Sequence, residues 1–377
     1  MPGWDVRFDV RVDLTDRRLV LAAARAHALA RVLRGTPVPP YMRERLDRLN
    51  IVRALRGTTG IEGIELSEAQ VEEILGVGSV TPVLPPALQR EEREVRNAEA
   101  AMRFTTDALR RDPTRPLSEP LICELHALTT AGIDYPTNVS GEYRHHPVQV
   151  GDYVPPRSGD DVRRPMSAFV AWMQAGPPAT WDPLVRAVIA HFCVVSIHPF
   201  GDGNGRTARA VESFMLHQAG INAYGFYSLA NFYYQQRSAY IQALTDARFY
   251  TSGDLTGFAV FALEGLVGEL TAVHAELQQF VKVLAFRDYA LELLTAHAGL
   301  SRPRRERLMQ VLVRLTRARI EAPRQVQDWA AIVAPLYAGV GRRTLSRDLA
   351  LLRRNELLTD ERGQLVANVA KMDRFTT

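Results

Sequence analysis

Residues 198–209 read HPFGDGNGRTAR and place a glycine-rich turn directly before a helical pattern. The first turn of a helix carries unpaired N–H groups and a partial positive charge, and glycines let that backbone approach a phosphate closely. Arg206 and Arg209 are three residues apart, so they lie on one face of the helix. The turn therefore predicts an anion site made of backbone N–H groups and two guanidinium groups.

Two further side chains of this turn predict chemistry. Asp202 is a candidate ligand for Mg²⁺, which bridges phosphates while using few protein ligands. His198 ends the preceding helical pattern, and the ordinary imidazole pKa of about 6.5 suits a general base. Together these groups indicate transfer of a phosphate-containing group to a hydroxyl. The turn is not a Walker loop, because GK[ST] is absent, and it lacks the spaced acidic ligands of an EF-hand.

Helical patterns lie on both sides of the turn. Asp182 is predicted to cap the helix that precedes it, and Pro183 to be the first helical residue. The helix that follows covers about 205–219, with Gly220 at its C-terminus. Further helices are predicted over 16–33, 41–56, 89–112 and 117–131, and helices dominate to about residue 298.

Two segments outside these helices have strand character. Residues 4–14 alternate strictly between apolar and charged side chains, which predicts a strand with one buried face. A loop over about 134–161 is rich in turn residues, and its VQVG stretch at 148–151 is interpreted as one short strand of a hairpin.

The composition is that of an ordinary globular protein. The chain has 377 residues, 46% hydrophobic and 23% charged, which predicts two or three modules and excludes collagen-like, disordered and disulfide-scaffold classes. Cys123 and Cys193 have no zinc or redox spacing and fit a reducing compartment. The N-terminus lacks the apolar core of a signal peptide, and no uninterrupted apolar run is about 18 residues long. We therefore expect a soluble, cytoplasmic protein with no membrane contact.

The C-terminal residues 301–377 differ in charge from the rest. They contain 16 Lys and Arg against 8 Asp and Glu, a net charge of +8. Helices over 304–318, 323–334 and 344–355, followed by a hairpin that turns at 360–363, predict a winged helix-turn-helix.

Basic residues gather at the start of the third of these helices. Arg342, Arg343 and Arg347 lie there with Ser346, where a recognition helix meets DNA. A solvated basic face on a protein-interaction module explains the same residues, so DNA binding through residues 301–377 stays one of two alternatives.

The full string at 198–209 resembles the signature of the Fic family, HPFx(D/E)GNGRxxR, at every signature position. Members of that family transfer a nucleoside monophosphate, usually AMP from ATP, to a Ser, Thr or Tyr of a protein. The resemblance implies a mainly α-helical, Fic-type core with a short β-hairpin flap. It covers about residues 90–250 and is most specific in the turn.

The resemblance also implies a role for each residue of the turn. His198 would deprotonate the target hydroxyl, Phe200 would anchor the turn in the core, and Asp202 would bind Mg²⁺. The phosphate-binding residues would be Gly203, Asn204 and Gly205 as an anion nest, with the Asn204 side chain on the α-phosphate, Arg206 on the β-phosphate and Arg209 on the γ-phosphate.

Two other segments are similar to parts of the family pattern. GEYR at 141–144, with VQVG after it, resembles the segment that leads into the family's flap over the target-binding groove. Pairing of the flap backbone with a target segment would be β-augmentation. Tyr240 corresponds loosely to a family aromatic near the nucleobase, although an aromatic at helical spacing also fits a core position.

The segment TTGIEG at 58–63 resembles the family's inhibitory motif, [S/T]xxxE[G/N]. It precedes the signature, which implies the subclass with an N-terminal inhibitory helix. Glu62 would then pair with Arg209 and compete with the γ-phosphate for that guanidinium. A buried charge pair is costly to break unless another anion replaces the carboxylate.

We therefore expect three regions: 1–90 with the inhibitory motif, 91–298 with the catalytic core, and 301–377 as a winged helix-turn-helix. The expected activity is transfer of AMP from Mg·ATP to a hydroxyl of a target protein or of the chain itself, inhibited by Glu62. Alternatives are UMP transfer, phosphocholine transfer or removal of AMP by the same fold, and a non-enzymatic, ATP-sensing, DNA-binding regulator. A second copy of the chain is a further candidate partner.

Overall fold

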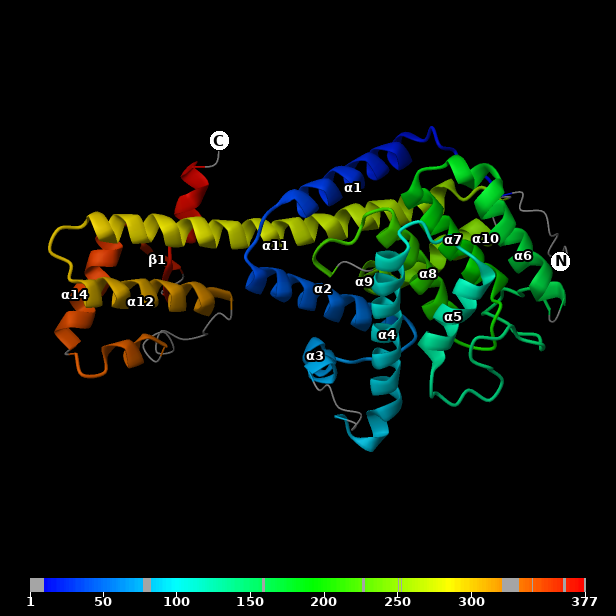
Figure 1. The fold of residues 1–377 in the computed structure, drawn as a ribbon, viewed down its shortest axis with the longest axis horizontal. Coiled ribbons are helices and arrows are strands. Elements are labelled where there is room, and N and C mark those ends of the chain that lie inside the picture. The colour runs from blue at the N-terminus through cyan, green and yellow to red at the C-terminus, as the bar shows by residue number, and fades with distance from the viewer. Residues whose placement is uncertain are drawn as a thin grey trace. The chain divides into compact units, whose positions relative to one another are not determined.

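A computed structural model describes residues 10–76, 83–157, 160–225, 228–249, 251, 253–320, 332–340, 342–361 and 364–375. The chain is mainly helical, which confirms the predicted fold class (Figure 1). It divides into two compact units, Met1–His274 and Ala275–Thr377. The sequence analysis expects the boundary between the last two regions at 298–301. The division lies instead inside α11 (Thr256–Ala296), because no proline interrupts that helix.

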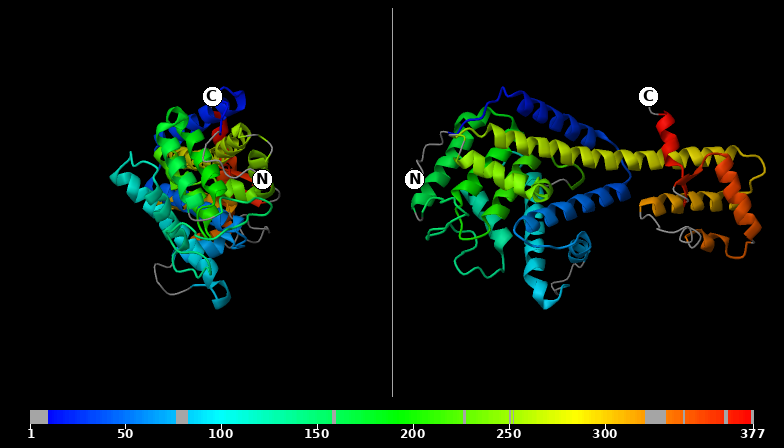
Figure 2. Two further views of the ribbon diagram at one scale, coloured as in Figure 1. Left: turned by 90° about the vertical axis from the view of Figure 1, so that its right-hand side faces the viewer. Right: turned by 180° about the vertical axis from the view of Figure 1, so that it is seen from behind.

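The first unit begins with α1 (Arg17–Gly35) and α2 (Pro40–Ile61), which diverge from a Pro-rich turn (Figures 1 and 2). The carboxylate of Asp16 caps α1 by accepting from the N–H groups of its first turn. Both helices confirm their predictions, but α2 continues past residue 56. The inhibitory-like motif is therefore the last turn of a helix.

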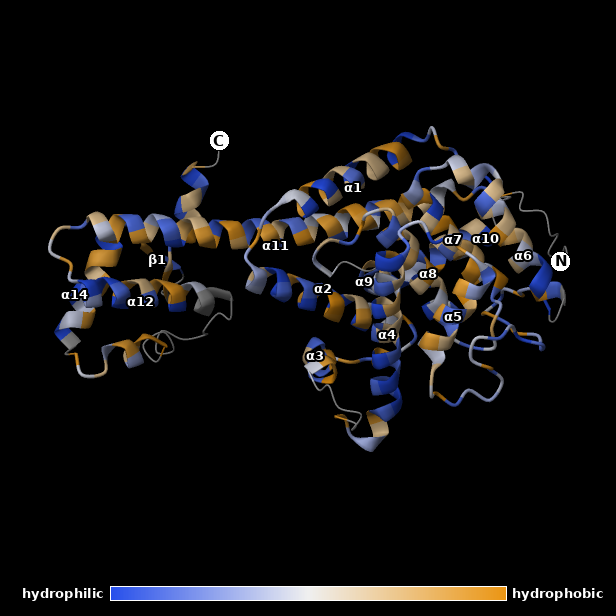
Figure 3. Ribbon diagram, viewed as in Figure 1, coloured by the Kyte–Doolittle hydropathy of each residue, from blue (hydrophilic) through white to orange (hydrophobic). Residues whose placement is uncertain are grey.

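The next helices are α3 (Glu68–Gly76), α4 (Gln89–Arg111), which follows the short helix η1 (Pro86–Leu88), and α5 (Glu119–Thr130). A cluster of apolar side chains packs α3 against α2 and α4; its members include Val52, Leu55, Val71, Ile74 and Val95. The N-terminal half of α4 is mostly hydrophilic (Figure 3). Two of its carboxylates, Glu92 and Glu94, are nevertheless buried.

Helices α7 (Pro183–Ile197) and α8 (Asn204–Gln218) lie side by side in the core of this unit (Figure 1). Asp182 caps α7 as predicted, since its carboxylate accepts from N–H of Leu184 at 2.8 Å. Every residue of α7 from Val188 to Ile197 is buried, as in a helix that is surrounded by others. Gly220, with a φ of 89°, terminates α8 as predicted.

The remaining elements of the first unit surround this pair. They are α6 (Asp160–Ala175), α9 (Ala230–Gln235), α10 (Arg237–Phe249), the first part of α11, and the short helices η2 (Pro177–Thr180) and η3 (Ala223–Gly225). Within the described residues, α11 is long and apolar enough to cross a membrane by length and composition. Its most apolar window is 56% buried, which is typical of a core helix. The search for an uninterrupted apolar run of about 18 residues did not detect α11, because isolated charged residues interrupt its apolar sequence.

The two predicted β segments have little regular structure. Most of the strand expected over 4–14 lies outside the described residues; in the described part, Arg11 makes a single parallel bridge with Asp254. The expected flap hairpin is one antiparallel bridge between Val150 and Tyr153, closed by two N–H···O bonds of 3.0 Å.

The second unit contains α12 (Arg302–Ile320), η4 (Ala334–Tyr337), α14 (Arg342–Arg354), the hairpin β1 (Leu358–Glu361) and β2 (Gln364–Ala367), and η5 (Val369–Phe375). The strands are antiparallel, with Leu358 opposite Ala367. Their hairpin confirms the predicted one, while most of the predicted helix over 323–334 lies outside the described residues. The second part of α11 shares an apolar core with α12, α14 and the strands.

Candidate functional site

The turn between α7 and α8 contains two residues with positive φ angles. His198 ends α7 with a φ of 53°, and Gly203 precedes α8 with a φ of 72°. A Cβ on Gly203 would lie 2.6 Å from Cγ2 of Thr130, and one on Gly201 would collide with the carbonyl of Thr137. Only glycine fits these two positions, so the chain passes close to α5 and turns sharply into α8.

The turn is held closed by its own residues. The Asn204 amide accepts from N–H of Phe200 and donates to its carbonyl, both at 2.9 Å. Phe200 is fully buried, as predicted, and its ring stacks on His126 at 3.7 Å. The resemblance assigned the Asn204 side chain to the α-phosphate, whereas in the structure both hydrogen bonds of its amide close the turn.

His126 on α5 supports the turn from outside. Its Nδ1 accepts from N–H of Gly141 at 2.9 Å, so Nε2 carries the proton and donates to the carbonyl of Asp202 at 3.1 Å. Burial lowers the pKa of His126 to about 4, and the neutral ring joins the turn to the segment before the flap. Sequence reasoning missed this residue, because one histidine in an apolar helix carries no distinguishing signal.

His198 is presented as a neutral imidazole with a defined tautomer. Its Nδ1 lies 3.2 Å from the carbonyl of Val195, which only accepts, so the proton is on Nδ1 and the lone pair on Nε2. Burial is the largest cause that lowers the pKa of His198 to about 4, and the charges of Arg248 and Arg144 act in the same direction. Nε2 is therefore able to accept a proton at neutral pH.

Arg209 is 2% exposed and is held by the end of α2. Its Nε donates to Oγ1 of Thr58 and its Nη2 to the carbonyl of the same residue, both at 2.9 Å. Nη2 also donates to Oε1 of Glu62 at 2.6 Å, the pair that the resemblance implied. Burial raises the pKa of Glu62, but the charge and hydrogen bond of Arg209 outweigh this and hold that pKa below its usual range.

Glu62 lies over the start of α8. A Cβ on Gly205 would collide with Oε1 of Glu62 and lie 3.1 Å from Nη1 of Arg209. The carboxylate is thus beside the first-turn backbone of α8, where a bound anion would be stabilised. Glu62 therefore lies against Gly205 and Arg209, two of the residues that the resemblance assigned to phosphate binding.

The sequence of α2 explains how this carboxylate reaches α8. A Cβ on Gly57 would lie 2.5 Å from N of Asn231, and one on Gly60 would lie 2.5 Å from the ring of Tyr234. These two glycines allow α2 to approach α9 closely. Glu62 caps the helix, and Gly63 with a φ of 95° turns the chain away. The side chain of Glu62 is 35% exposed.

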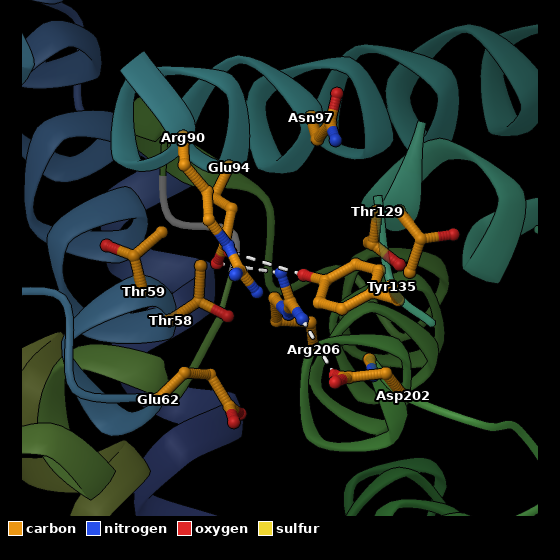
Figure 4. Close-up of polar contacts among 12 residues, drawn as sticks. Thr58, Thr59, Glu62, Arg90, Glu94, Asn97, Thr129, Tyr135, Asp202 and Arg206 are labelled. Atoms are coloured by element: carbon orange, nitrogen blue, oxygen red, sulfur yellow. Dashed lines mark hydrogen bonds and ion pairs between the residues drawn. The ribbon is translucent and has the colours of Figure 1, made fainter. Parts of the chain in front are cut away.

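Arg206 has different partners from Arg209, because it contacts Glu94 and Asp202 (Figure 4). It is 4% exposed, and its Nη1 forms an ion pair of 2.7 Å with Oε2 of Glu94 on α4. Its Nη2 lies 3.2 Å from Oδ1 of Asp202. Sequence reasoning missed Glu94, because the charged N-terminal half of α4 has the appearance of a solvated surface.

The Asp202 carboxylate fits the ligand set of Mg²⁺. Its side chain is 47% exposed, and Oδ1 accepts from Arg206 and from N–H of Gly203. Oδ2 faces no hydrogen-bond donor among the described residues. Mg²⁺ bound to phosphates commonly takes only one or two carboxylates from the protein, and the single half-exposed carboxylate of Asp202 is compatible with that pattern.

The flap is fixed to the turn by Arg144, which is buried. Its Nε donates to the carbonyl of His198 at 2.8 Å, and its remaining nitrogens donate to the carbonyls of His146, Pro156 and Arg157. Burial lowers the pKa of Arg144 to about 10. Carbonyl dipoles stabilise this cation without a carboxylate.

Tyr240 is a correction to the sequence analysis. It is buried, its ring stacks on Tyr233 at 4.5 Å, and its hydroxyl bonds to Nε2 of His191 at 2.8 Å. The hydroxyl of Tyr233 donates to Glu212 in the same cluster. Tyr240 therefore packs in the core of α7, α8, α9 and α10 rather than facing a nucleobase, because its helical position points inward.

The structure thus brings together, at one end of α8, nearly all of the predicted site residues: Glu62, His198, Asp202, Gly203, Asn204, Gly205, Arg206 and Arg209. Beside the two arginines is an open pocket between α2, α4 and α8. Small side chains line it, Ala98, Ala101, Thr105, Ala210 and Ser213 among them.

Comparison with known proteins agrees with this geometry. Residues 116–216 match the Fic/DOC family. This Fic/DOC segment contains α5, the flap, α7, the turn and most of α8.

Curated relatives extend the similarity. Over 171 residues, 45% of the chain, it is 32% identical to "Protein adenylyltransferase Fic" of Drosophila sechellia, covering 32% of that protein. Over 139 residues, 37% of the chain, it is 36% identical to "Protein adenylyltransferase fic-1" of Caenorhabditis elegans, covering 27% of it. The chain spans about a third of the length of the curated relatives it matches.

Solved structures agree with the Fic fold. Residues 134–508 of Fic-1 from C. elegans superpose with a TM-score of 0.56 at 26% identity, over 69% of this chain and 73% of that one. A Fic family protein from Desulfovibrio desulfuricans G20 superposes over 96% of this chain and 94% of its own, with a TM-score of 0.53 and 20% identity. The second likeness concerns the fold alone.

Proposed function

We propose that this protein transfers AMP from Mg·ATP to a hydroxyl of a target protein and that Glu62 inhibits the transfer. The observation that carries the proposal is the meeting of Nε2 of His198, the N-terminus of α8 and two buried guanidinium groups at one turn. The relatives named protein adenylyltransferase support the same reaction.

In the proposed reaction, Nε2 of His198 accepts the proton of the target hydroxyl. The hydroxyl oxygen forms a bond to the α-phosphorus, the bond to the β-phosphate oxygen breaks, and pyrophosphate leaves. The start of α8, with Arg206 and Arg209, binds the phosphates and holds them in line. Mg²⁺ held by Asp202 would neutralise phosphate charge.

Inhibition follows from the position of Glu62. Its carboxylate lies over Gly205 and bonds to Arg209, so phosphate oxygens and Glu62 compete for one space and one cation. Because Glu62 is a half-exposed cap at the end of α2, it is able to leave when another anion replaces it.

Incubation with α-labelled ATP, Mg²⁺ and a cell lysate tests the proposal. Glu62→Gly should raise incorporation of label into protein, including this chain, and His198→Ala should abolish incorporation while ATP still binds. Absence of label in Glu62→Gly would contradict the proposal. The mass added to the product separates AMP transfer from UMP or phosphocholine transfer, and release of AMP from a modified protein identifies the reverse reaction.

The flap supports a protein as the acceptor. The segment 147–152 is exposed or half-exposed, and its ends are fixed by Arg144 and by the bond from Tyr153 to the carbonyl of Ser196. This short bridged turn, anchored at both ends, would offer backbone groups to a target strand, and such pairing requires no particular target sequence.

The second unit supports DNA as a second partner. Helix α14 directly precedes the hairpin β1–β2, as a recognition helix precedes a wing. Asp348 faces inward, where it accepts from Arg304 at 2.7 Å and from Tyr337 at 3.0 Å. The outward face of α14 is basic, with Arg343, Arg347, Arg353 and Arg354 exposed.

Binding of a duplex DNA to the full chain at 50 and 200 mM salt tests this second proposal. Affinity should fall steeply with salt, and Arg343→Ala and Arg347→Ala should each weaken binding and reduce the salt slope by about one. Arg374→Ala, an exposed cation outside α14, is the matched control. Equal effects of all three variants would contradict a role of α14, and dependence of binding on ATP without label transfer would favour the regulator.

A further inference from the structure

Two carboxylates meet the two arginines of the site, and they are not equivalent. Glu62 reaches Arg209 from the end of α2, and Glu94 reaches Arg206 from within α4. The side chain of Glu62 is 35% exposed, whereas that of Glu94 is 5% exposed. The first is placed to leave, and the second is enclosed.

One ion pair and two hydrogen bonds hold the Glu94 carboxylate (Figure 4). Oε2 meets Nη1 of Arg206 at 2.7 Å, while Oε1 accepts from the hydroxyl of Tyr135 at 3.2 Å and from Nε of Arg90 at 3.3 Å. The guanidinium groups of Arg90 and Arg206 lie 5.0 and 5.4 Å from the ring centre of Tyr135. Glu94 and Tyr135 thus hold Arg206 through both charge and ring contact.

A phosphate arriving at this site cannot replace Glu94 as it would replace Glu62. Loss of Glu94 from its position would leave Arg206 without its closest counter-ion and would strand a buried carboxylate. Arg206 therefore keeps its orientation when an anion binds. Among the described residues its Nε and Nη1 have no hydrogen-bond partner, although Nη1 forms the ion pair with Glu94, so the guanidinium retains unused donors.

We propose that Glu94, together with Tyr135, is a positioning residue that fixes Arg206 for the second phosphate of a bound nucleotide. This inference rests on the proposed function, together with the assignment of the second phosphate to Arg206 that the resemblance implies. Glu94 thereby makes the site selective for nucleotides with a β-phosphate over nucleoside monophosphates. Without it, Arg206 would be free to turn toward Glu62.

The experiment compares binding of ADP and AMP, each with Mg²⁺, to the full chain carrying Glu62→Gly, with and without Glu94→Gln. Glu94→Gln keeps the shape of the side chain but removes the charge. We expect ADP affinity to fall about tenfold, the effect of weakening one charge-assisted contact, and AMP affinity to change less than twofold. Tyr135→Phe should lower ADP affinity in the same direction by a smaller factor.

Glu92→Gln is the matched control. Glu92 lies on the same helix, is equally buried, pairs with Arg96 at 2.8 Å and accepts from N–H of Leu84, but does not touch Arg206. Its replacement should lower the melting temperature without changing the ratio of ADP to AMP affinity.

Each other outcome overturns the inference in a distinct way. Tighter ADP binding by Glu94→Gln would make Glu94 a competitor of the phosphate. If Glu94→Gln weakens the binding of ADP and of AMP equally, and Glu92→Gln has the same effect, Glu94 has only a structural role. Unchanged ADP binding by both Glu94→Gln and Tyr135→Phe would remove the role while the proposed function stands. If Glu62→Gly alone binds neither nucleotide, the proposed function fails and the inference fails with it.

Discussion

Oε1 of Glu62 accepts a hydrogen bond from Nη2 of Arg209 at 2.6 Å, across 147 positions of the chain. The bond joins the C-terminal end of α2 to the first turns of α8. In the proposed function that end of α8 binds the phosphates, so this one carboxylate would control their access.

The charge of Glu62, rather than its size, should exclude the nucleotide. Glu62→Gln keeps the volume and removes the charge, so the affinity for Mg·ATP should rise about tenfold, as measured by calorimetry. Glu65→Gln, an exposed carboxylate three residues further on, should leave the affinity unchanged. Equal affinities of Glu62→Gln and the unaltered chain would contradict competition by charge.

The close approach of α2 to α9 should keep Glu62 in place. A Cβ at Gly57 would overlap the backbone of Asn231, so Gly57→Ala should lower the free energy of unfolding by about 2 kcal/mol and raise nucleotide affinity as α2 shifts. Gly268→Ala on α11, where a Cβ meets nothing within 4 Å, should be neutral or stabilise by up to about 1 kcal/mol. Thermal unfolding of both variants decides this, and equal stability of the two would argue against tight packing at Gly57.

Arg144 should fix the flap through its fork of donors. Arg144→Lys keeps the charge but satisfies fewer carbonyls, so stability should fall by roughly 2 kcal/mol and amide exchange should rise over 145–157. Arg157→Lys, an exposed change in the same segment, should alter neither quantity. Exchange rates that stay the same in Arg144→Lys would remove this role.

The free energy of unfolding should fall as the pH is lowered from 6.5 to 4. His126 and His198 both have folded-state pKa values of about 4 against an unfolded value of 6.5, so the unfolded chain binds more protons in this window. Each imidazole should lower the free energy of unfolding by roughly 2 kcal/mol at pH 5 relative to pH 7. His198→Ala should remove about half of that loss in denaturant unfolding. A loss of the same size in the variant would mean that His198 is not buried in its neutral form.

Local rules of the chain predicted the elements that carry the site. The Asp182 cap with Pro183, the glycines of the turn and Gly220 gave the limits of α7 and α8 to within a residue or two. The three-residue spacing of Arg206 and Arg209 predicted that both lie on one face of α8. The resemblance gave the pair of Glu62 with Arg209, which no pattern within either segment predicts.

Other features depended on burial, which the sequence does not report. The charged start of α4 looked like a solvated face, but Glu94 is buried against Arg206. Tyr240 fitted either a ligand contact or the core, and packing against Tyr233 placed it in the core. His126 and Arg144 acquired their roles only when α5 and the flap came together at the turn.

The amino-acid sequence alone specified where helices begin and end and which residues form the glycine turn, because caps, glycine conformation and helical spacing act between residues a few positions apart. Only the folded chain decided which carboxylate meets which arginine, Glu62 with Arg209 and Glu94 with Arg206. Those pairs depend on how closely α2 and α4 approach α8, and that approach is set by side-chain volume and burial across more than a hundred residues.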